Sequence, residues 1–259
     1  MPGASTPLPV DLTGLRVAIS AGAGGIGLVM ADCFAGRGAR VFVCDLDAAA
    51  LAACPHPSVR ADMGDAVQAE GFVDAAVAAL GGLDVLVNNA GIAGPTARVE
   101  DVTPEDLDRV LRVDVASMFH CTRRALPALR AAGGGSIVNL SSVAGRFGFA
   151  LRSPYSSAKW GVVGFTKSLA IELGPEGIRV NAILPGAVAG ERVRQVIAAK
   201  AEANGLSFEE QESRILANSL RTYVTPHDVA NMALYLCSPF GATISGQALA
   251  IDGDQQYLA

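Results

Sequence analysis

Apolar residues along the chain form short runs that alternate with longer stretches of helical periodicity, and this alternation predicts the fold. Apolar, β-branched runs that indicate strands occupy residues 15–20, 39–44, 83–88, 135–141, 178–184 and 247–251, with a weaker one at 58–62. Helical patterns fall between them, at roughly 25–36, 66–80, 104–131, 154–173 and 226–237. Near-continuous apolar strands that alternate with helices are typical of parallel sheets. The pattern therefore predicts an α/β fold: a doubly wound, mostly parallel seven-stranded sheet with helices on both faces.

Two segments depart from this rhythm. Residues 1–11 show no pattern, and we expect a flexible tail before a single domain that spans 12–259. Residues 189–225 are charged and helical and contain no strand, although they follow the sixth predicted strand. An insertion there lies at the carboxyl edge of the sheet, where such folds bind ligands. We interpret it as a substrate lid, with a solvated helical excursion or a subunit contact as the alternative.

The bulk composition of the 259 residues argues against several kinds of partner. The net charge is −5, the mean hydropathy is +0.36, and no basic run marks a nucleic-acid interface. Five scattered cysteines, none at metal-ligand spacing, fit reduced thiols in a cytoplasmic protein without a metal site. The N-terminus lacks the features of a signal peptide, and the longest uncharged stretch, 229–251, is interrupted by proline and glycine. We therefore expect a cytoplasmic location and neither a membrane nor a nucleic-acid partner.

The stretch SAGAGGIG, residues 20–27, lies between a predicted strand and a predicted helix. Glycines at that point allow a tight turn, let the backbone approach a pyrophosphate, and leave N–H groups of the helix N-terminus available. Asp45 ends the next strand, where a carboxylate accepts hydrogen bonds from ribose hydroxyls and repels a 2′-phosphate. No Arg or Lys stands in the loop or directly after Asp45. The sequence thus predicts a Rossmann-type dinucleotide site that takes NAD rather than NADP, with strand capping as the alternative role of Asp45.

A tyrosine and a lysine stand four residues apart in the stretch SPYSSAKWG, residues 153–161. Residues at this spacing share one face of a helix. Taken alone, Tyr155 and Lys159 are more typical of an ordinary helix face than of a catalytic site. Their interpretation depends on what the rest of the chain carries.

With these features in order, the chain from Leu12 to its C-terminus resembles the short-chain dehydrogenases/reductases. The family's glycine motif falls on Ser20, Ala21, Gly25, Ile26 and Gly27. Further matches are NNAG at 88–91, Ser142, the pair Tyr155 and Lys159, RVNAILPG at 179–186 and ISGQALAIDG at 244–253. Each motif alone is a weak signal, whereas the set in this order and spacing is specific.

The resemblance implies an NAD-dependent oxidoreductase that interconverts a secondary alcohol and a ketone. Tyr155 matches the family's general acid/base, and the ammonium of Lys159 favours the phenolate form. Lys159 also holds the nicotinamide ribose, and Ser142 binds the substrate oxygen. Hydride then moves between the nicotinamide and the carbon that bears this oxygen.

The family's cofactor contacts carry over to a larger set of positions. Asp62 and Met63 match residues that flank the adenine ring, and Val188 matches a residue whose backbone contacts the carboxamide. The expected cofactor-binding set is Ser20, Gly22, Gly25, Ile26, Gly27, Asp45, Asp62, Met63, Asn89, Ala90, Gly91, Tyr155, Lys159, Pro185, Gly186 and Val188.

Three positions depart from the family pattern and bear on the site. Ala21 replaces the leading glycine, so its methyl group is strained if the position needs a positive φ. Asp114 stands where an Asn often joins Ser, Tyr and Lys as a fourth catalytic member. We hypothesise that this carboxylate is tolerated and alters the pH profile. Gly190 replaces a threonine that binds the carboxamide, which predicts looser anchoring or a contact from the lid.

The substrate leaves a weaker signal in the sequence. Phe149 is expected in the pocket wall, together with Arg146 and Arg152 of the same loop and Arg192 of the lid. These arginines predict either an anionic substrate, held by a guanidinium fork, or surface ion pairs with the lid's glutamates. The sequence pattern favours the ion pairs.

The same residues bear on two alternative functions, and the resemblance bears on the oligomeric state. A 3-oxoacyl-thioester reductase predicts NADPH and a basic patch, which Asp45 and the acidic balance oppose. A non-catalytic NAD sensor is opposed by the intact Ser142, Tyr155 and Lys159. The resemblance also implies a homotetramer, or a homodimer, that forms through the predicted helices at 104–131 and 154–173 and through the C-terminal segment.

Overall fold

The computed structural model describes residues 9–258, and its centre is a seven-stranded sheet in which every pair of neighbouring strands is parallel. The strands are β1 (Arg16–Ile19), β2 (Arg40–Asp45), β3 (Ser58–Arg60), β4 (Val85–Asn88), β5 (Gly135–Leu140), β6 (Ile178–Pro185) and β7 (Ala248–Ile251). Their order is β3-β2-β1-β4-β5-β6-β7. The order reverses between β1 and β4, and this reversal leaves a crevice at the carboxyl ends of those strands. The predicted fold class is confirmed.

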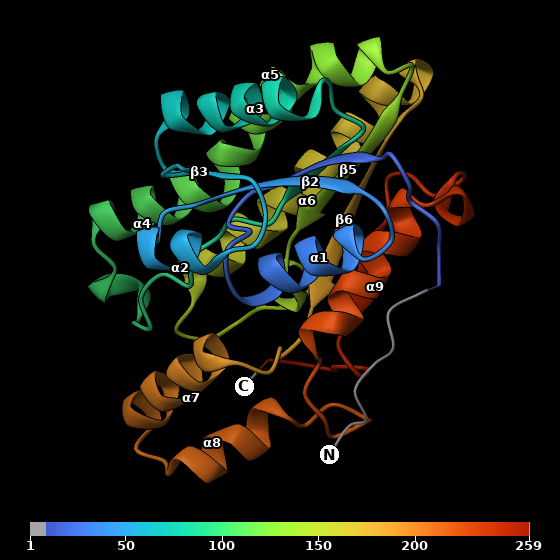
Figure 1. Cartoon of the computed structure of the whole chain (residues 1–259). Coiled ribbons are helices and arrows are strands. Elements are labelled where there is room, and N and C mark those ends of the chain that lie inside the picture. The colour runs from blue at the N-terminus through green and yellow to red at the C-terminus, as the bar shows by residue number, and fades with distance from the viewer. Residues whose placement is uncertain (1–8, 259) are drawn as a thin grey trace.

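Helices cover both faces of the sheet (Figure 1). They are α1 (Gly25–Ala35), α2 (Ala48–Ala53), α3 (Ala66–Leu80), α4 (Pro104–Leu111), α5 (Ser117–Ala131), α6 (Ser153–Leu173) and α9 (Pro226–Cys237). One apolar core joins α1 and α9 to the sheet, and a second joins α3 and α5 to it. The short helix α2 was not predicted from the sequence. It follows an N-cap at Asp47, whose carboxylate accepts hydrogen bonds from the N–H groups of Ala49 and Ala50.

The helix predicted over 104–131 is interrupted. A π-helical turn, η2 (Arg112–Ala116), separates α4 from α5. Such a turn inserts an extra residue into the helix, and it often lies at a functional site. In this protein it carries Asp114, whose side chain is fully buried.

The insertion at 189–225 folds into two helices, α7 (Glu191–Asn204) and α8 (Phe208–Ile215). Its two ends are joined by backbone hydrogen bonds, from the Ala189 N–H to the Val224 carbonyl (2.8 Å) and from the Val224 N–H to the Ala187 carbonyl (2.9 Å). The helices stand together, away from the other helices (Figure 1). Because the insertion starts just after the carboxyl end of β6, it lies beside the crevice.

The predicted flexible tail, residues 1–11, falls mostly outside the described residues. Val10 is buried at 6% exposure and packs in the α1 and α9 core. The packed chain therefore begins before Leu12, because a valine in this position adds apolar contact to an existing core. Among the described helices, none is both long and apolar enough to cross a membrane.

Candidate functional site

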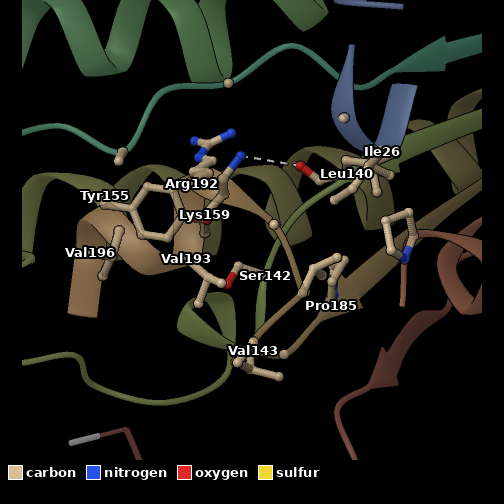
Figure 2. A pocket seen from close by; sticks show the side chains of 18 of the residues that line it. Ile26, Leu140, Ser142, Val143, Tyr155, Lys159, Pro185, Arg192, Val193 and Val196 are labelled. Carbon is tan, nitrogen blue, oxygen red and sulfur yellow. Dashed lines mark hydrogen bonds between the residues drawn. The ribbon is translucent and has the colours of Figure 1, made fainter. Parts of the chain in front are cut away.

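A cavity of about 460 Å³ opens at the carboxyl ends of the central strands. Its walls come from the glycine loop before α1, the ends of β2, β4, β5 and β6, the first turns of α6, and the lid helix α7. Figure 2 shows Ile26 and Pro185 on one side of this cavity and Tyr155 and Val196 on the other. Elements that are remote in the sequence thus meet where the strand order reverses.

The three residues expected to carry the chemistry line this cavity together. Ser142 follows β5 and its Oγ accepts a hydrogen bond from the Ala144 N–H (3.1 Å), which holds the side chain at the cavity wall. Tyr155 and Lys159 lie on α6, and the Lys159 Nζ is 5.4 Å from the centre of the Tyr155 ring. A phenol, an ammonium and a hydroxyl therefore meet in one enclosed space.

Lys159 is held from behind by two oxygen atoms. Its side chain is 4% exposed, its Nζ donates to the Leu140 carbonyl (3.2 Å), and the Asp114 Oδ2 lies 3.0 Å away. The other carboxylate oxygen of Asp114 accepts from the Ile92 N–H (2.7 Å). A Cβ at Gly91 would lie 3.0 Å from the Lys159 Nζ and 3.2 Å from the Asp114 Oδ2, so a side chain there would crowd the pair. Asp114 lies outside the cavity lining and touches the reaction site through Lys159.

The glycine loop is fastened to the end of β4. The Ser20 Oγ accepts hydrogen bonds from the N–H groups of Asn89 and Ala90 (both 3.0 Å), and the Asn89 side chain donates to the carbonyls of Ser20 (3.0 Å) and Ala21 (2.9 Å). A Cβ at Gly27 would collide with the Ala21 carbonyl, so only glycine fits there. Ala21 itself has a φ of 50°. This is the strained, positive-φ conformation that was expected if an alanine replaces the leading glycine of the motif.

Asp45 reaches the cavity from the end of β2. One carboxylate oxygen accepts from the Ala23 N–H and the other from the Asp47 N–H, both at 3.2 Å. These contacts fix the carboxylate beside the glycine loop. Because each oxygen has a second lone pair, the group keeps acceptor capacity for a ligand.

The remaining predicted cofactor residues divide into two groups. Those that line the cavity, besides Tyr155, Lys159 and Asp45, are Gly25, Ile26, Gly27, Asn89, Gly91, Pro185, Gly186 and Val188. Those that do not line it are Ser20, Gly22, Asp62, Met63 and Ala90. In the second group, Ser20 and Ala90 form the loop anchor, and the Asp62 carboxylate accepts from the Gly64 N–H (2.8 Å). Met63 is buried beside Cys44, and a Cβ at Gly22 would meet the Val43 side chain.

The predicted substrate residues also divide. Phe149, Arg152 and Arg192 line the cavity, whereas Arg146 is exposed and lies over the Phe147 ring at 5.1 Å. Arg152 is 3% exposed, and its two Nη atoms donate to the Thr96 Oγ1 (3.1 Å) and the Ala93 carbonyl (2.7 Å). Burial is the main cause that lowers the pKa of Arg152 from its ordinary value, yet a guanidinium remains charged in proteins.

Sequence reasoning missed a buried lysine on the lid. Lys200 is 1% exposed, and its Nζ lies 4.2 Å from the centre of the Phe149 ring. Burial, followed by the charge of Arg152, lowers the pKa of Lys200 to about 8. Its helical spacing from Val193 and Val196, which line the cavity, was the available signal.

The C-terminal segment was a second omission. Gln255 and Leu258 line the cavity, and Leu258 forms a parallel bridge with Phe149. The sequence analysis assigned this segment to subunit contacts alone. No local pattern places it in the cavity, because its neighbours lie about a hundred residues earlier in the chain.

Comparisons with known proteins agree with this geometry. A family model described as enoyl-(acyl carrier protein) reductase matches residues 21–253. The D-β-hydroxybutyrate dehydrogenase of Cupriavidus necator is 34% identical over 253 residues, which cover 93% of this chain and 98% of that protein.

Two solved structures extend the likeness. An actinorhodin polyketide ketoreductase with NADPH has a TM-score of 0.87 at 34% identity and covers 94% of this chain and 98% of its own. An NAD⁺-bound xylitol dehydrogenase has a TM-score of 0.88 at 25% identity, with coverage of 93% and 98%.

Proposed function

This chain belongs to the short-chain dehydrogenase/reductase family, and we propose that it interconverts a secondary alcohol and a ketone with NAD as cofactor and Tyr155 as general acid/base. The observation that carries the proposal is the meeting of Ser142, Tyr155 and Lys159 in a cavity that the glycine loop and Asp45 also line. The relatives are named for a hydroxybutyrate, a polyketide ketone and xylitol. Their common chemistry is a carbon that changes between CH–OH and C=O.

The residues present fit a dinucleotide. Glycines at Gly22 and Gly27 let the loop before α1 pack closely against Val43 and Ala21, and the helix N-terminus favours a pyrophosphate. Asp45 lines the cavity beside the glycine loop, where a carboxylate would accept hydrogen bonds from ribose hydroxyls. Its negative charge supports NAD over NADP. When bound, NAD supplies the acceptor or donor of hydride.

The chain's own residues manage the proton and the position of the substrate. Ser142 donates a hydrogen bond to the substrate oxygen, which fixes the reacting carbon against the cofactor side of the cavity. Tyr155 takes the hydroxyl proton during oxidation and returns it during reduction. The Lys159 ammonium stabilises the phenolate that this exchange requires, since opposite charges attract at short range in a poorly solvated site.

Asp114 serves as a positioning residue in this proposal. The carboxylate holds the Lys159 ammonium at 3.0 Å on the side away from the cavity. It also offsets part of the charge that acts on Tyr155, so the pH profile depends on it.

Replacing Tyr155 with Phe tests the catalytic assignment. The variant keeps the ring and loses the proton, so kcat/KM for a secondary alcohol with NAD should fall by at least about 100-fold. Tyr235→Phe, on the outer part of α9, is the matched control. Reduced nicotinamide absorbance follows the reaction, and NAD binding is measured separately. Binding of NAD without turnover of any alcohol or ketone would instead support a sensor.

Replacing Asp45 with Ser tests the cofactor assignment. Without the carboxylate, the KM for NAD should rise and NADP should become usable, because the repulsion of a 2′-phosphate is removed. Wild-type preference for NADPH in the reductive direction would overturn the NAD assignment and favour the oxoacyl-thioester reductase.

We also propose that the enzyme works in the cytoplasm as a homotetramer or a homodimer. Phe119 of α5 and Trp160 of α6 are each 51% exposed, and the Phe119 ring lies 4.0 Å from the Phe165 ring. Exposed aromatic side chains on these two helices fit a subunit contact. Light scattering tests this assembly, and a stable monomer at micromolar concentration would contradict it.

A further inference from the structure

We propose that the substrate carries a carboxylate or a comparable anionic group, which Arg152 binds inside the cavity and Arg192 of the lid binds from above. The inference rests on the proposed function, since it names the class of alcohol or ketone that this site accepts. It reverses the preference of the sequence analysis, which assigned the arginines to surface ion pairs.

The first observation is the state of the Arg152 side chain. The residue is 97% buried, and its two Nη atoms donate to neutral oxygens of Thr96 and Ala93. Its Nε has no hydrogen-bond partner, although it is shielded from solvent. Among residues 9–258, no carboxylate forms an ion pair with this guanidinium. A buried charge without a counter-ion is costly, so the site is built to receive one.

The second observation is the place of this charge. The Arg152 guanidinium lies 5.4 Å from the centre of the Tyr155 ring and 5.8 Å from that of Phe149. Both rings line the same cavity. An anion at Arg152 is therefore close to the hydroxyl that exchanges a proton with the substrate. One small molecule can therefore place its anionic group at Arg152 and its reacting carbon at Tyr155.

The third observation is the charge of the surroundings. Arg192 acts on Arg152 as a positive charge and also lines the cavity (Figure 2). Asp114 acts on Arg152 in the opposite sense but is paired with Lys159. Two positive side chains from separate elements, Arg152 before α6 and Arg192 on α7, thus line the substrate end of the cavity. This potential attracts an anion and disfavours a cation.

The lid's glutamates do not supply the counter-ion. Glu191 accepts from the Gln195 side chain (3.2 Å), and Glu210 closes the N-terminus of α8 as the partner of Ser207. Glu212 accepts from the Tyr223 hydroxyl (2.5 Å). In the described part of the chain, none of them pairs with Arg152 or Arg192. The ion pairs that the sequence pattern favoured are therefore not what these two arginines form.

The geometry also limits the size of the substrate. The cavity measures about 460 Å³, and the nicotinamide end of the cofactor must share it with the substrate. A short hydroxy acid, or the keto acid that corresponds to it, meets the limits on charge, distance and volume. A neutral alcohol brings no counter-ion to Arg152.

The decisive comparison uses the wild-type enzyme with pairs of substrates that share a carbon skeleton. Hydroxy acids of four to six carbons, with the hydroxyl at carbon 2, 3 or 4, are assayed with NAD beside their primary amides. We expect kcat/KM for the best acid to exceed that of its amide by about 10- to 100-fold. Equal values for acid and amide would overturn this inference and leave the proposed function standing. If no alcohol or ketone at all is turned over, the proposed function itself fails.

Variants then locate the preference. Arg152→Gln should abolish the ratio of acid to amide, Arg152→Lys should restore part of it, and Arg192→Gln should reduce it without disturbing a buried contact. Arg98→Gln is the control, since it removes the same charge from a side chain that is 75% exposed. A ratio that survives both Arg152→Gln and Arg192→Gln would overturn the assignment.

Equilibrium binding provides a readout that is independent of turnover. With NAD present, butyrate should raise the unfolding temperature of the wild type more than butyramide does, and Arg152→Gln should remove this difference. Equal protection by butyrate and butyramide in the wild type would count against the site.

Discussion

Two buried cations, Lys159 and Arg152, line one cavity, and they differ in the groups that balance their charge. Lys159 lies against the Asp114 carboxylate at 3.0 Å and the Leu140 carbonyl at 3.2 Å. Arg152 lies seven residues earlier, at the start of the same helix, and its partners among residues 9–258 are neutral oxygens. The burial of the two is nearly the same, at 3% exposure for each residue.

The difference separates a cation that belongs to the machinery from one that serves a ligand. A positive charge that must stay in one position during every cycle is balanced within the chain. A positive charge that serves to bind an anion takes its counter-ion from the ligand, so the chain need not supply one. The following changes test this contrast, in order of the effect expected.

The largest effect should come from Lys159→Met. It removes the cation beside Tyr155 and leaves Asp114 as an uncompensated buried charge, so unfolding by urea should show a loss of about 3–5 kcal/mol. Activity should fall by at least about 100-fold. The double variant Lys159→Met with Asp114→Leu should recover stability without recovering activity. A single variant as stable as the wild type would show that the pair is not balanced as described.

Lys200→Met tests the cationic side through stability. Burial and Arg152 lower the pKa of Lys200 to about 8, against an ordinary 10.5. Between these values the unfolded chain binds the extra proton, so this lysine makes the stability of the wild type rise with pH. The variant lacks this rise. Its free energy of unfolding, relative to that of the wild type, should therefore fall by up to about 3 kcal/mol between pH 8 and 10.5. Urea unfolding curves across this range measure it, and parallel profiles would contradict it.

Asp114→Asn should change the pH profile more than the rate. The amide oxygen can still accept from the Ile92 N–H, but the negative charge beside Lys159 is gone. Lys159 then favours the phenolate of Tyr155 more strongly, and the acidic limb of the oxidation profile should move to lower pH. Asp108→Asn, an exposed change on α4, is the control. Identical profiles for Asp114→Asn and the wild type would remove the positioning role.

The smallest effect is expected at the glycine loop, where the backbone conformation of Ala21 is strained. Ala21 has a φ of 50°, and a glycine adopts this conformation without strain. Ala21→Gly should raise the free energy of unfolding by up to about 1 kcal/mol. Ala35→Gly, at the last residue of α1, should instead lower it by a few tenths of a kcal/mol, about half the helix-interior cost or less. A loss in both variants would show that the strain at Ala21 is negligible.

The strands and most helices could be read from the sequence because their signal is local. A parallel strand buried on both faces is a near-continuous apolar run, so the predictions at 135–141 and 178–184 agree with β5 and β6 within one residue at each end. The π turn at Arg112–Ala116 escaped, because one extra residue hardly changes the helical period. Val10 escaped because a lone valine carries no periodicity.

The residues of the site also divide into those with a local signal in the sequence and those without one. Ser142, Tyr155 and Lys159 could be named from their spacing, since the end of β5 and the first turns of α6 hold them at a fixed distance. Leu258 could not be named, because nothing near it in the sequence records that it meets Phe149. The signal for Lys200 was its helical spacing from Val193 and Val196, but its contact with Phe149 needed the tertiary structure.

The sequence by itself determined the parallel sheet, the glycine loop and the candidate catalytic residues, because periodicity and backbone sterics act over a few residues. Only the tertiary structure decided that Asp114 stands behind Lys159 and that Arg152 is buried without an ion pair to any carboxylate of residues 9–258. The reason is physical: the energy of a buried charge depends on every charge within several ångströms, and these neighbours come from distant parts of the chain.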